Sequence, residues 1–256
     1  MQLSKHLTTL IIATASITAS LGQSTQGWQL EKMPPALETD FALSSLPPRL
    51  RDAAAVYLLD PQKGYFLTRK GTNGFSVFVM RTQWEVAEFL PDMYMPISYD
   101  EEGGKTFMRL YFDVAAMRAT GKYNPIQIRD TVVQRVKRGV YKGPSRTGIS
   151  YMLCPLVRAR GADGFSNSVM PHYMFYAPGV ENKDIGGDWD GGHSPFTTDP
   201  AAGLLKKEHS IFNLIIMPAG DAEKAKIIEQ NKDLLAKLAA YKPYFKINAM
   251  NEMAHH

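Results

Sequence analysis

The apolar residues fall into patterns that change along the chain. The stretch from Leu7 to Leu21 is apolar or small throughout, follows a short start carrying Lys5, and ends in small residues before Gln23. This order is typical of a secretory signal peptide over residues 1–22. The apolar run of about 15 residues is shorter than the roughly 20 that a membrane span requires. We therefore expect an exported protein, periplasmic or extracellular after cleavage near Gly22.

Short runs rich in β-branched and aromatic residues come next. They cover Val56–Leu59, Gly64–Arg69 and Phe75–Arg81. The pair Asn73-Gly74 separates the last two runs, and Asn-Gly supplies the positive φ angles of a tight hairpin turn. The pattern predicts an N-terminal three-stranded antiparallel meander.

Helical spacing of apolar residues appears later in the chain. We expect helices from Gln83 to Leu90, from Asp113 to Thr120 and from Asn124 to Gly139, the last with a capping residue, a first-turn proline and a terminal glycine. A long amphipathic helix is expected from Asp221 to about Tyr241. Its apolar face comprises Ala225, Ile228, Leu235, Leu238 and Ala239.

The remaining strands set the fold class. They are predicted over Gly148–Val157, Met170–Tyr176 and Ser210–Met217, each bounded by Gly or Pro. Strands come in runs and do not alternate regularly with helices. This favours an α+β fold with a mainly antiparallel sheet packed by amphipathic helices.

Composition fits one globular domain. Removing the signal peptide leaves 256 − 22 = 234 residues, which a single core can fill. We expect an extended lead-in over residues 23–45, the domain over 46–245 and a frayed tail over 246–256. The net charge of +4 is too small and too dispersed to indicate nucleic acid. Cys154 is the only cysteine, which excludes an intramolecular disulfide, and its apolar surroundings predict an inert, buried thiol.

The densest cluster of reactive side chains lies between Met170 and Asp199, interleaved with glycines. Polar, Gly-rich loops of this kind often carry binding residues. Asp188, Asp190 and His193 are candidate metal ligands, and imidazole with carboxylate suits zinc or iron. A calcium loop centred on Asp188 fails at both anchor positions, where Asp and Glu are needed. The sequence names no particular cofactor.

The strand around His172 offers a second kind of site. His172 and His193 are candidate catalytic bases, and the alternative for His172 is a histidine paired with a backbone carbonyl. Alternation places His172, Met174 and Tyr176 on one face and Tyr173 and Phe175 on the other. A pocket here would be rich in aromatic residues and methionine and suited to a flat or apolar ligand. The candidate ligand-binding residues are Tyr173, Tyr176 and Trp189.

The sequence does not match the common motifs of catalytic nucleophiles and metalloproteases. Gly143 to Thr147 lacks the final glycine of a nucleophile elbow, and neither a phosphate-binding loop nor His-Glu-x-x-His is present.

One stretch of the chain is strongly basic: from Arg129 to Arg146 six basic residues accompany one acid. Such a run is either a solvated helix face or a contact for an anionic surface or phospholipid headgroup through Arg135, Lys137 and Arg138.

Three segments carry a resemblance. They are Lys70-Gly71-Thr72-Asn73-Gly74-Phe75, Gly148-Ile149-Ser150-Tyr151-Met152-Leu153 and Pro171-His172-Tyr173-Met174-Phe175-Tyr176-Ala177-Pro178. Together they resemble segments of a group of exported bacterial proteins, over most of the mature chain. The resemblance implies an exported globular protein of bacterial type. It assigns no activity and no site residue.

The leading hypothesis is a protein that binds a small or apolar ligand in a pocket lined by the His172 strand and the loop from Val180 to Asp199. One alternative is a hydrolase that uses His172 or His193 as a base, or a metal held with Asp188 and Asp190. Another alternative is an envelope interaction protein that uses the basic helix face. Nucleic acid is not expected as a partner, and the mature chain is expected to lack a transmembrane segment.

Overall fold

An eight-stranded mixed sheet forms the centre of the molecule in the computed structural model, which describes residues 30–87, 89–161, 164–187, 194–198, 204–205 and 211–247. The predicted signal peptide lies outside these residues. The strand order is β2-β1-β3-β4-β5-β8-β10-β9, and β6 and β7 form a separate hairpin. The strands are β1 Ala55–Asp60, β2 Gly64–Arg69, β3 Ser76–Met80, β4 Met95–Tyr99, β5 Ile149–Met152, β6 Val157–Gly161, β7 Gly164–Ser168, β8 His172–Tyr176, β9 Phe196–Thr198 and β10 Leu214–Pro218.

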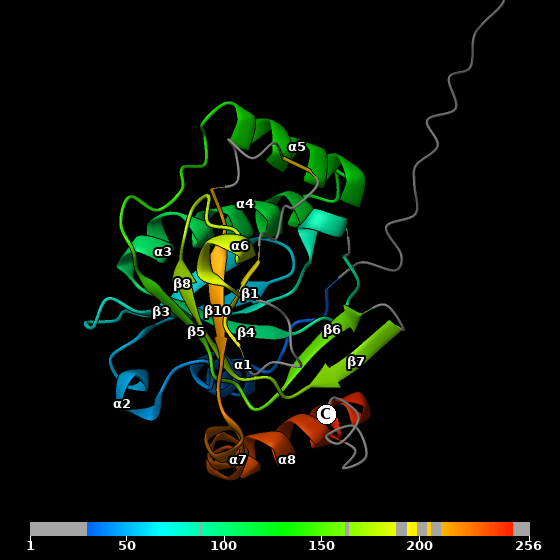
Figure 1. The fold of residues 1–256 in the computed structure, drawn as a ribbon. Coiled ribbons are helices and arrows are strands. Elements are labelled where there is room, and N and C mark those ends of the chain that lie inside the picture. The colour runs from blue at the N-terminus through cyan, green and yellow to red at the C-terminus, as the bar shows by residue number, and fades with distance from the viewer. Residues whose placement is uncertain are drawn as a thin grey trace, which may run out of the picture.

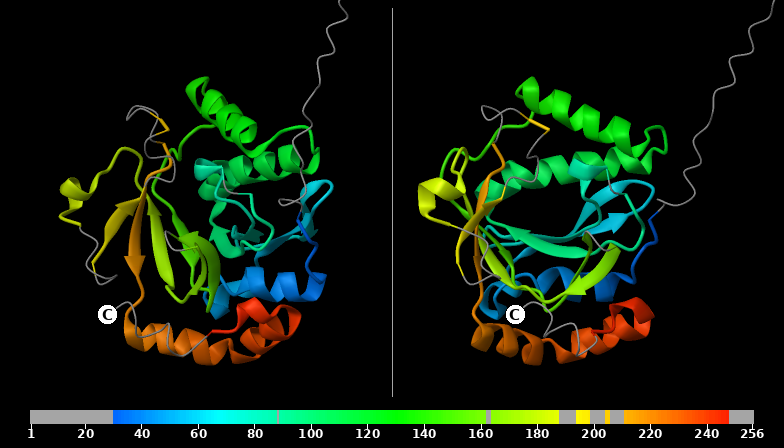
Figure 2. Two further views of the ribbon diagram at one scale, coloured as in Figure 1. Left: turned by 90° about the vertical axis from the view of Figure 1, so that its right-hand side faces the viewer. Right: turned by 45° about the vertical axis from the view of Figure 1, so that its right-hand side comes forward.

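Helices cover both faces of the sheet (Figures 1 and 2). One layer holds α4 and α5, and the opposite layer holds α1, α7 and α8. The α-helices are α1 Pro35–Leu43, α2 Pro48–Arg51, α3 Glu101–Lys105, α4 Phe107–Ala119, α5 Pro125–Lys137, α6 Asn182–Ile185, α7 Asp221–Gln230 and α8 Lys232–Tyr241. Two 3-10 turns are η1 Trp84–Val86 and η3 Pro243–Phe245.

Each face of the sheet has its own apolar core. Phe78, Tyr99 and Met174 belong to the core under α4 and α5. Val77, Val79 and Phe41 belong to the core that also holds α8 and η3 residues.

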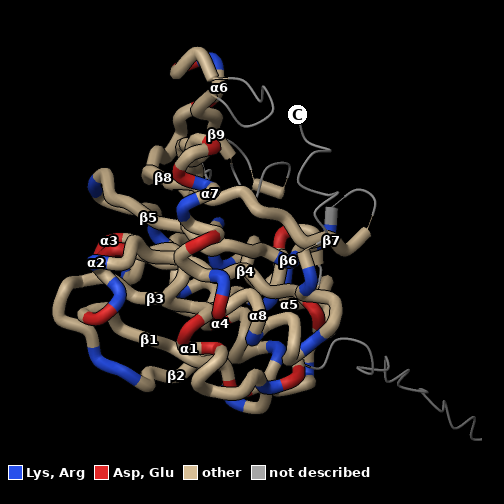
Figure 3. The backbone as a smooth tube through the Cα atoms, turned by 90° about the horizontal axis from the view of Figure 1, so that it is seen from below, with Lys and Arg blue, Asp and Glu red and all other residues tan. Residues whose placement is uncertain are grey.

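Cys154 is 1% exposed, as predicted, and burial raises the pKa of its thiol to about 12. Basic and acidic positions are interspersed along the backbone seen from the α7 and α8 side (Figure 3).

The expected combination of helices with a large β-sheet is confirmed. Its described strand pairs are antiparallel except for β1 with β3, so the sheet is mixed, and it does not start with a meander. The third strand, β3, pairs with β1 in parallel, and β2 is an edge strand. The chain after β2 crosses the beginning of β1, where Thr72 N donates to Ala53 O over 2.7 Å. Gly71 lies so close to β1 that a Cβ atom would sit 2.2 Å from Ala55 N. The Asn-Gly pair therefore belongs to a crossover and not to a hairpin.

The expected extended lead-in is wrong over α1, which is a buried helix. Phe41 and Ala42 are fully buried, and Leu37 lies on the same side. Pro34 and Pro35 do not prevent the helix because they occupy its N-cap and first position, where no N–H is needed for an intrahelical bond. These apolar residues cover the sheet face that β1, β3 and β4 present.

The predicted helix from Gln83 to Leu90 is also wrong, because among the described residues of this stretch, which leave out position 88, only η1 is helical. Ala87 follows in a left-handed conformation with φ 55°. Carbonyl groups of the segment after η1 are satisfied by arginine side chains: Arg118 donates to Phe89 O, and Arg81 donates to Met93 O over 2.6 Å. A helix is not required to satisfy these backbone groups.

The predicted helix from Asp221 to Tyr241 is two helices with a break at Asn231. Asn231 is 5% exposed and has φ −116°, outside the helical range. Its side-chain amide donates to Ile227 O over 2.7 Å, and its oxygen accepts from Arg51. Ile227, and not Ile228, is the buried residue of α7. The buried, hydrogen-bonded Asn231 therefore interrupts the continuous apolar helix face that the sequence predicts.

Other predicted elements differ mainly in their ends. Helix α5 is confirmed, with a capping box between Asn124 and Gln127. The predicted helix at Asp113 starts six residues earlier, at Phe107. The run from Gly148 to Val157 divides into β5 and the start of β6. Within the part of the chain that the structure describes, no helix is long and apolar enough to cross a membrane.

We predict that Gly71→Ala lowers the free energy of unfolding by about 2 kcal/mol, because the new methyl group overlaps the β1 backbone. Urea unfolding measures this loss. Gly104→Ala is the matched control, since its Cβ would meet only Met108 Cε at 4.0 Å. Equal stability of the two variants would contradict the crossover.

Candidate functional site

His172 is buried at the start of β8. It is 4% exposed, and Nδ1 lies 2.7 Å from Met170 O. Burial lowers the pKa of the imidazole and favours its neutral form. These contacts match the alternative in which the histidine is paired with a backbone carbonyl.

Tyr173 and Tyr176 lie on opposite faces of β8, as the alternation predicts. The Tyr173 hydroxyl donates to Glu223 of α7 with 2.5 Å between the oxygens, and its ring packs against Tyr151. Tyr176 is 3% exposed and packs against Phe107 on the other side. The two tyrosines therefore do not line one common pocket.

Four predicted site residues lie outside the described residues: Asp188, Trp189, Asp190 and His193. The metal site and the hydrolase built on them therefore stay predictions. Among the residues that are described, no group of three or more His, Cys, Asp or Glu side chains could hold a metal ion.

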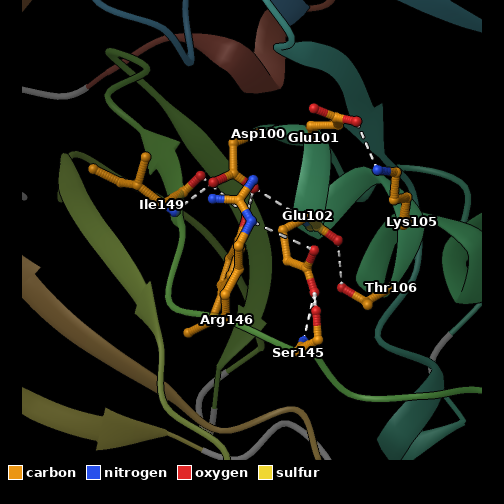
Figure 4. Close-up of polar contacts among 10 residues, drawn as sticks. Asp100, Glu101, Glu102, Lys105, Thr106, Ser145, Arg146 and Ile149 are labelled. Carbon is orange, nitrogen blue, oxygen red and sulfur yellow. Dashed lines mark hydrogen bonds and ion pairs between the residues drawn. The ribbon is translucent and has the colours of Figure 1, made fainter.

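Asp100 joins the ends of three strands, and Figure 4 shows its contact with Ile149 of β5. It follows β4 and caps α3, where its Oδ1 accepts from Gly103 N over 2.9 Å. Its Oδ2 accepts from Ile149 N at the start of β5 over 3.0 Å. The Tyr176 hydroxyl at the end of β8 lies 3.0 Å from Asp100 Oδ1. All these partners are internal, so we assign Asp100 a structural role.

Glu102 holds the loop before β5 (Figure 4). Its Oε1 accepts from Ser145 N over 2.5 Å and from Ser145 Oγ over 2.9 Å, and Arg146 lies 3.8 Å from Oε2. The backbone hydrogen bond from Ser145 is the main reason that the pKa of Glu102 is lowered. A carboxylate stabilised in this way is a weak base, so the arrangement fastens the loop and does not activate the serine.

The basic stretch is only partly available to a partner. Arg135 Nη1 lies 3.1 Å from Asp113 Oδ2 and 3.1 Å from the Tyr141 hydroxyl. Lys137 and Arg138 are exposed at the end of α5. Of the three predicted contact residues, Arg135 is therefore held within the protein, and the other two face outwards.

Two arginines lie buried beside a small cavity. Arg81 and Arg118 are 3% and 7% exposed, and Tyr65 and Tyr111 line the same cavity, which has room for about one water molecule. The Arg118 Nη1 donates to Arg81 O over 2.9 Å. Because this space is so small and the guanidinium groups hold backbone carbonyls, we regard the pair as a structural feature.

Glu38 of α1 is a buried acid near this pair. It is 1% exposed, and its Oε1 accepts from Leu59 N over 2.9 Å. Burial raises the pKa of Glu38 to about 7, against the opposing effects of the Leu59 hydrogen bond and of Arg81. The folded protein therefore favours the protonated carboxyl at mildly acidic pH.

A larger cavity of about 310 Å³ lies between the β6–β7 hairpin and the end of the described chain. We call it the C-terminal pocket. Its lining combines two cations, two aromatic rings and further polar and apolar groups. The lining residues are Arg158, Phe165, Ser166, Asn167, Pro243, Tyr244, Lys246 and Ile247.

Arg158 forms the charged wall of the C-terminal pocket. Its guanidinium carbon lies 4.4 Å from the Tyr244 ring centroid and 5.3 Å from that of Phe165. Its Nη2 lies 2.8 Å from Asp92 Oδ2, and its Nη1 donates to Asn167 Oδ1 over 3.3 Å. The Nε donor is buried with no acceptor among the described residues. The side chain is thus held in place by rings and acceptors on several elements.

The opposite wall of the C-terminal pocket is the segment from Pro243 to Ile247, which Phe245 fixes to the core. Phe245 is 1% exposed, with its ring centroid 4.9 Å from that of Tyr94 and 6.0 Å from that of Phe41. The Asn167 amide of β7 donates to Tyr244 O over 2.7 Å and to Lys246 O over 3.1 Å. The hairpin and η3 are therefore fixed to each other, and the pocket between them is preformed.

Sequence reasoning missed this pocket. Arg158 and Phe165 belong to no sequence motif, and the sequence predicts that the chain after residue 245 frays. One available signal was the spacing of Tyr241, Tyr244 and Phe245, which matches one side of a helical turn. Nothing in the sequence paired this turn with the hairpin near residue 160.

Comparison of the chain with protein-family models, with curated proteins and with solved structures finds no significant match. The candidate site therefore rests on its geometry.

We predict that Glu38 makes the protein less stable as the pH rises from about 4.5 through 7. Its folded pKa of about 7 lies above the ordinary value of 4.5, so its stabilising contribution is complete below 4.5 and is lost across this window. A shift of this size corresponds to about 3 kcal/mol.

The comparison variant is Glu38→Gln, which keeps an oxygen acceptor for Leu59 N. The difference in unfolding free energy between wild type and variant isolates Glu38, because the lowered pKa of His172 has the opposite effect on stability and is common to both proteins. Denaturant unfolding at several pH values should show the difference falling by about 3 kcal/mol. A difference independent of pH would contradict the assignment.

Proposed function

We propose that the protein is an exported binding protein that holds a small, flat, acidic molecule in the C-terminal pocket. The observation that carries the proposal is the Arg158 guanidinium, which lies over the rings of Phe165 and Tyr244 at the wall of a 310 Å³ cavity. Ligand sites are typically of about 300–1,000 Å³ and combine apolar walls with a few oriented polar groups. Export rests on the signal-peptide pattern over residues 1–22 and is part of the proposal.

The lining favours a flat ligand with one acidic group. Phe165 and Tyr244 offer ring surfaces, and Ile247 adds an apolar side chain. The charge of Arg158 is balanced by Asp92, at 2.8 Å. Lys246 is exposed and has no ion-pair partner among the described residues, so it supplies the net positive charge. A ligand carboxylate would be attracted by Lys246 and orientated by the fixed guanidinium.

This location differs from the pocket expected beside the His172 strand. His172 and Tyr176 are both packed in the interior, and neither lines the C-terminal pocket. The preformed space and the fixed cation support the C-terminal pocket as the better candidate. The general class of function, binding of a small ligand, is the same in both hypotheses.

We expect indole-3-acetate, a flat carboxylate, to bind more tightly than its uncharged amide. Lys246→Gln should weaken binding of the carboxylate about three- to tenfold and leave the amide unchanged, because it removes one charge-assisted contact. Phe165→Ala should weaken both compounds, because both use the ring surface. Isothermal titration calorimetry of the wild type and both variants with each compound measures the six affinities.

Two matched variants control for indirect effects. Lys226→Gln removes an exposed lysine of α7, and Phe66→Ala removes an exposed ring of β2. Neither residue lines the C-terminal pocket, so neither change should alter binding. Equal effects of Lys246→Gln and Lys226→Gln, or no binding of either compound, would overturn the proposal.

A further inference from the structure

The end of α5 carries an exposed apolar residue among unpaired cations. Arg138 is the C-cap, Gly139 has φ 68°, and Val140 N donates to Arg135 O over 2.9 Å. Gly139 N also donates to Val136 O over 2.9 Å. This pair of bonds defines a Schellman motif, in which the residue after the glycine usually packs against the helix. Here that residue, Val140, is 37% exposed.

Four basic side chains lie around Val140. Lys137, Arg138 and Lys142 are its neighbours in sequence and are exposed. Arg109 of α4 is exposed as well and donates to Val140 O over 3.4 Å. Among the described residues, none of the four has an ion-pair partner. We call Arg109, Lys137, Arg138, Val140 and Lys142 the α5 corner.

The α5 corner is held rigidly from beneath. Tyr141 is 2% exposed, and its hydroxyl donates to Asp113 over 2.9 Å. Arg135 lies against the same two side chains and is therefore not free for a partner. The fixed Tyr141 between Val140 and Lys142 makes these two neighbours point away from the core.

The α5 corner has more basic residues than stabilisation of the α5 C-terminus would require. Basic residues stabilise a helix C-terminus, but this effect falls off within the last turn. Lys142 lies beyond that turn, and Arg109 comes from another helix. Elsewhere, on the side seen in Figure 3, basic and acidic positions are intermixed. Helix α5 is also the outermost element of its layer (Figure 2).

We propose that the α5 corner docks on an anionic phospholipid surface. The four cations would lie at the headgroups, and Val140 would enter the interface between headgroups and acyl chains. A protruding corner with an aliphatic tip matches a membrane surface better than it matches a small anion, which needs a concave site. Docking of the α5 corner on a membrane does not depend on the ligand proposed for the C-terminal pocket.

The test is cosedimentation of the protein with phosphatidylcholine vesicles that contain phosphatidylglycerol, compared with phosphatidylcholine alone. We expect binding only to the anionic vesicles, weakening as salt is added. The triple variant Lys137→Gln, Arg138→Gln, Lys142→Gln should lose about tenfold or more in partitioning. Val140→Ser, which keeps every charge, should lose about fivefold through the apolar contact.

The matched control removes three exposed lysines elsewhere: Lys63→Gln, Lys70→Gln, Lys226→Gln. It changes the net charge equally and should bind like the wild type. Equal losses in the two triple variants would reduce the effect to net charge and overturn the proposal. Release by inorganic phosphate at constant ionic strength would identify a free-anion site instead, and no binding to anionic vesicles would also overturn the proposal.

Discussion

The central strands β3 and β4 are buried along almost their whole length, so the chain must supply an apolar helical layer on each side of the sheet. One layer comes from the middle of the chain, as α4 and α5. The other combines α1 with α7 and α8 and so brings together segments from both ends of the described chain. The contact between Phe41 and Phe245 is the direct result.

This second layer also creates the candidate site. The Phe245 ring packs edge to face with Tyr94, and the Arg81 guanidinium carbon lies 3.8 Å from the centroid of the Tyr94 ring. The neighbouring Tyr244 then meets Arg158 of the β6–β7 hairpin. Cations and rings thus connect the buried core to the C-terminal pocket. The pocket is a consequence of how the end of the chain is anchored, and its walls need little rearrangement to receive a ligand.

The sequence predicted those features that depend on local patterns. The capping box of α5, the alternation in β8 and the burial of Cys154 follow from neighbours in the chain. It failed where distant contacts decide the outcome. Asn231, at the break between α7 and α8, accepts a hydrogen bond from Arg51, 180 positions away, and Gly71 belongs to a crossover because β1 lies beneath it. The C-terminal pocket joins residues about 80 positions apart, and no local pattern records that pairing.

The central claim is that a small acidic ligand occupies the C-terminal pocket, and its most direct test is to locate a bound probe. Amide chemical shifts of isotopically labelled full-length protein can be followed by NMR while indole-3-acetate is added. We expect the largest changes on residues 165–167 and 244–247, which come from both walls. Changes centred on β8 and the loop after it, with none at these two segments, would contradict the account.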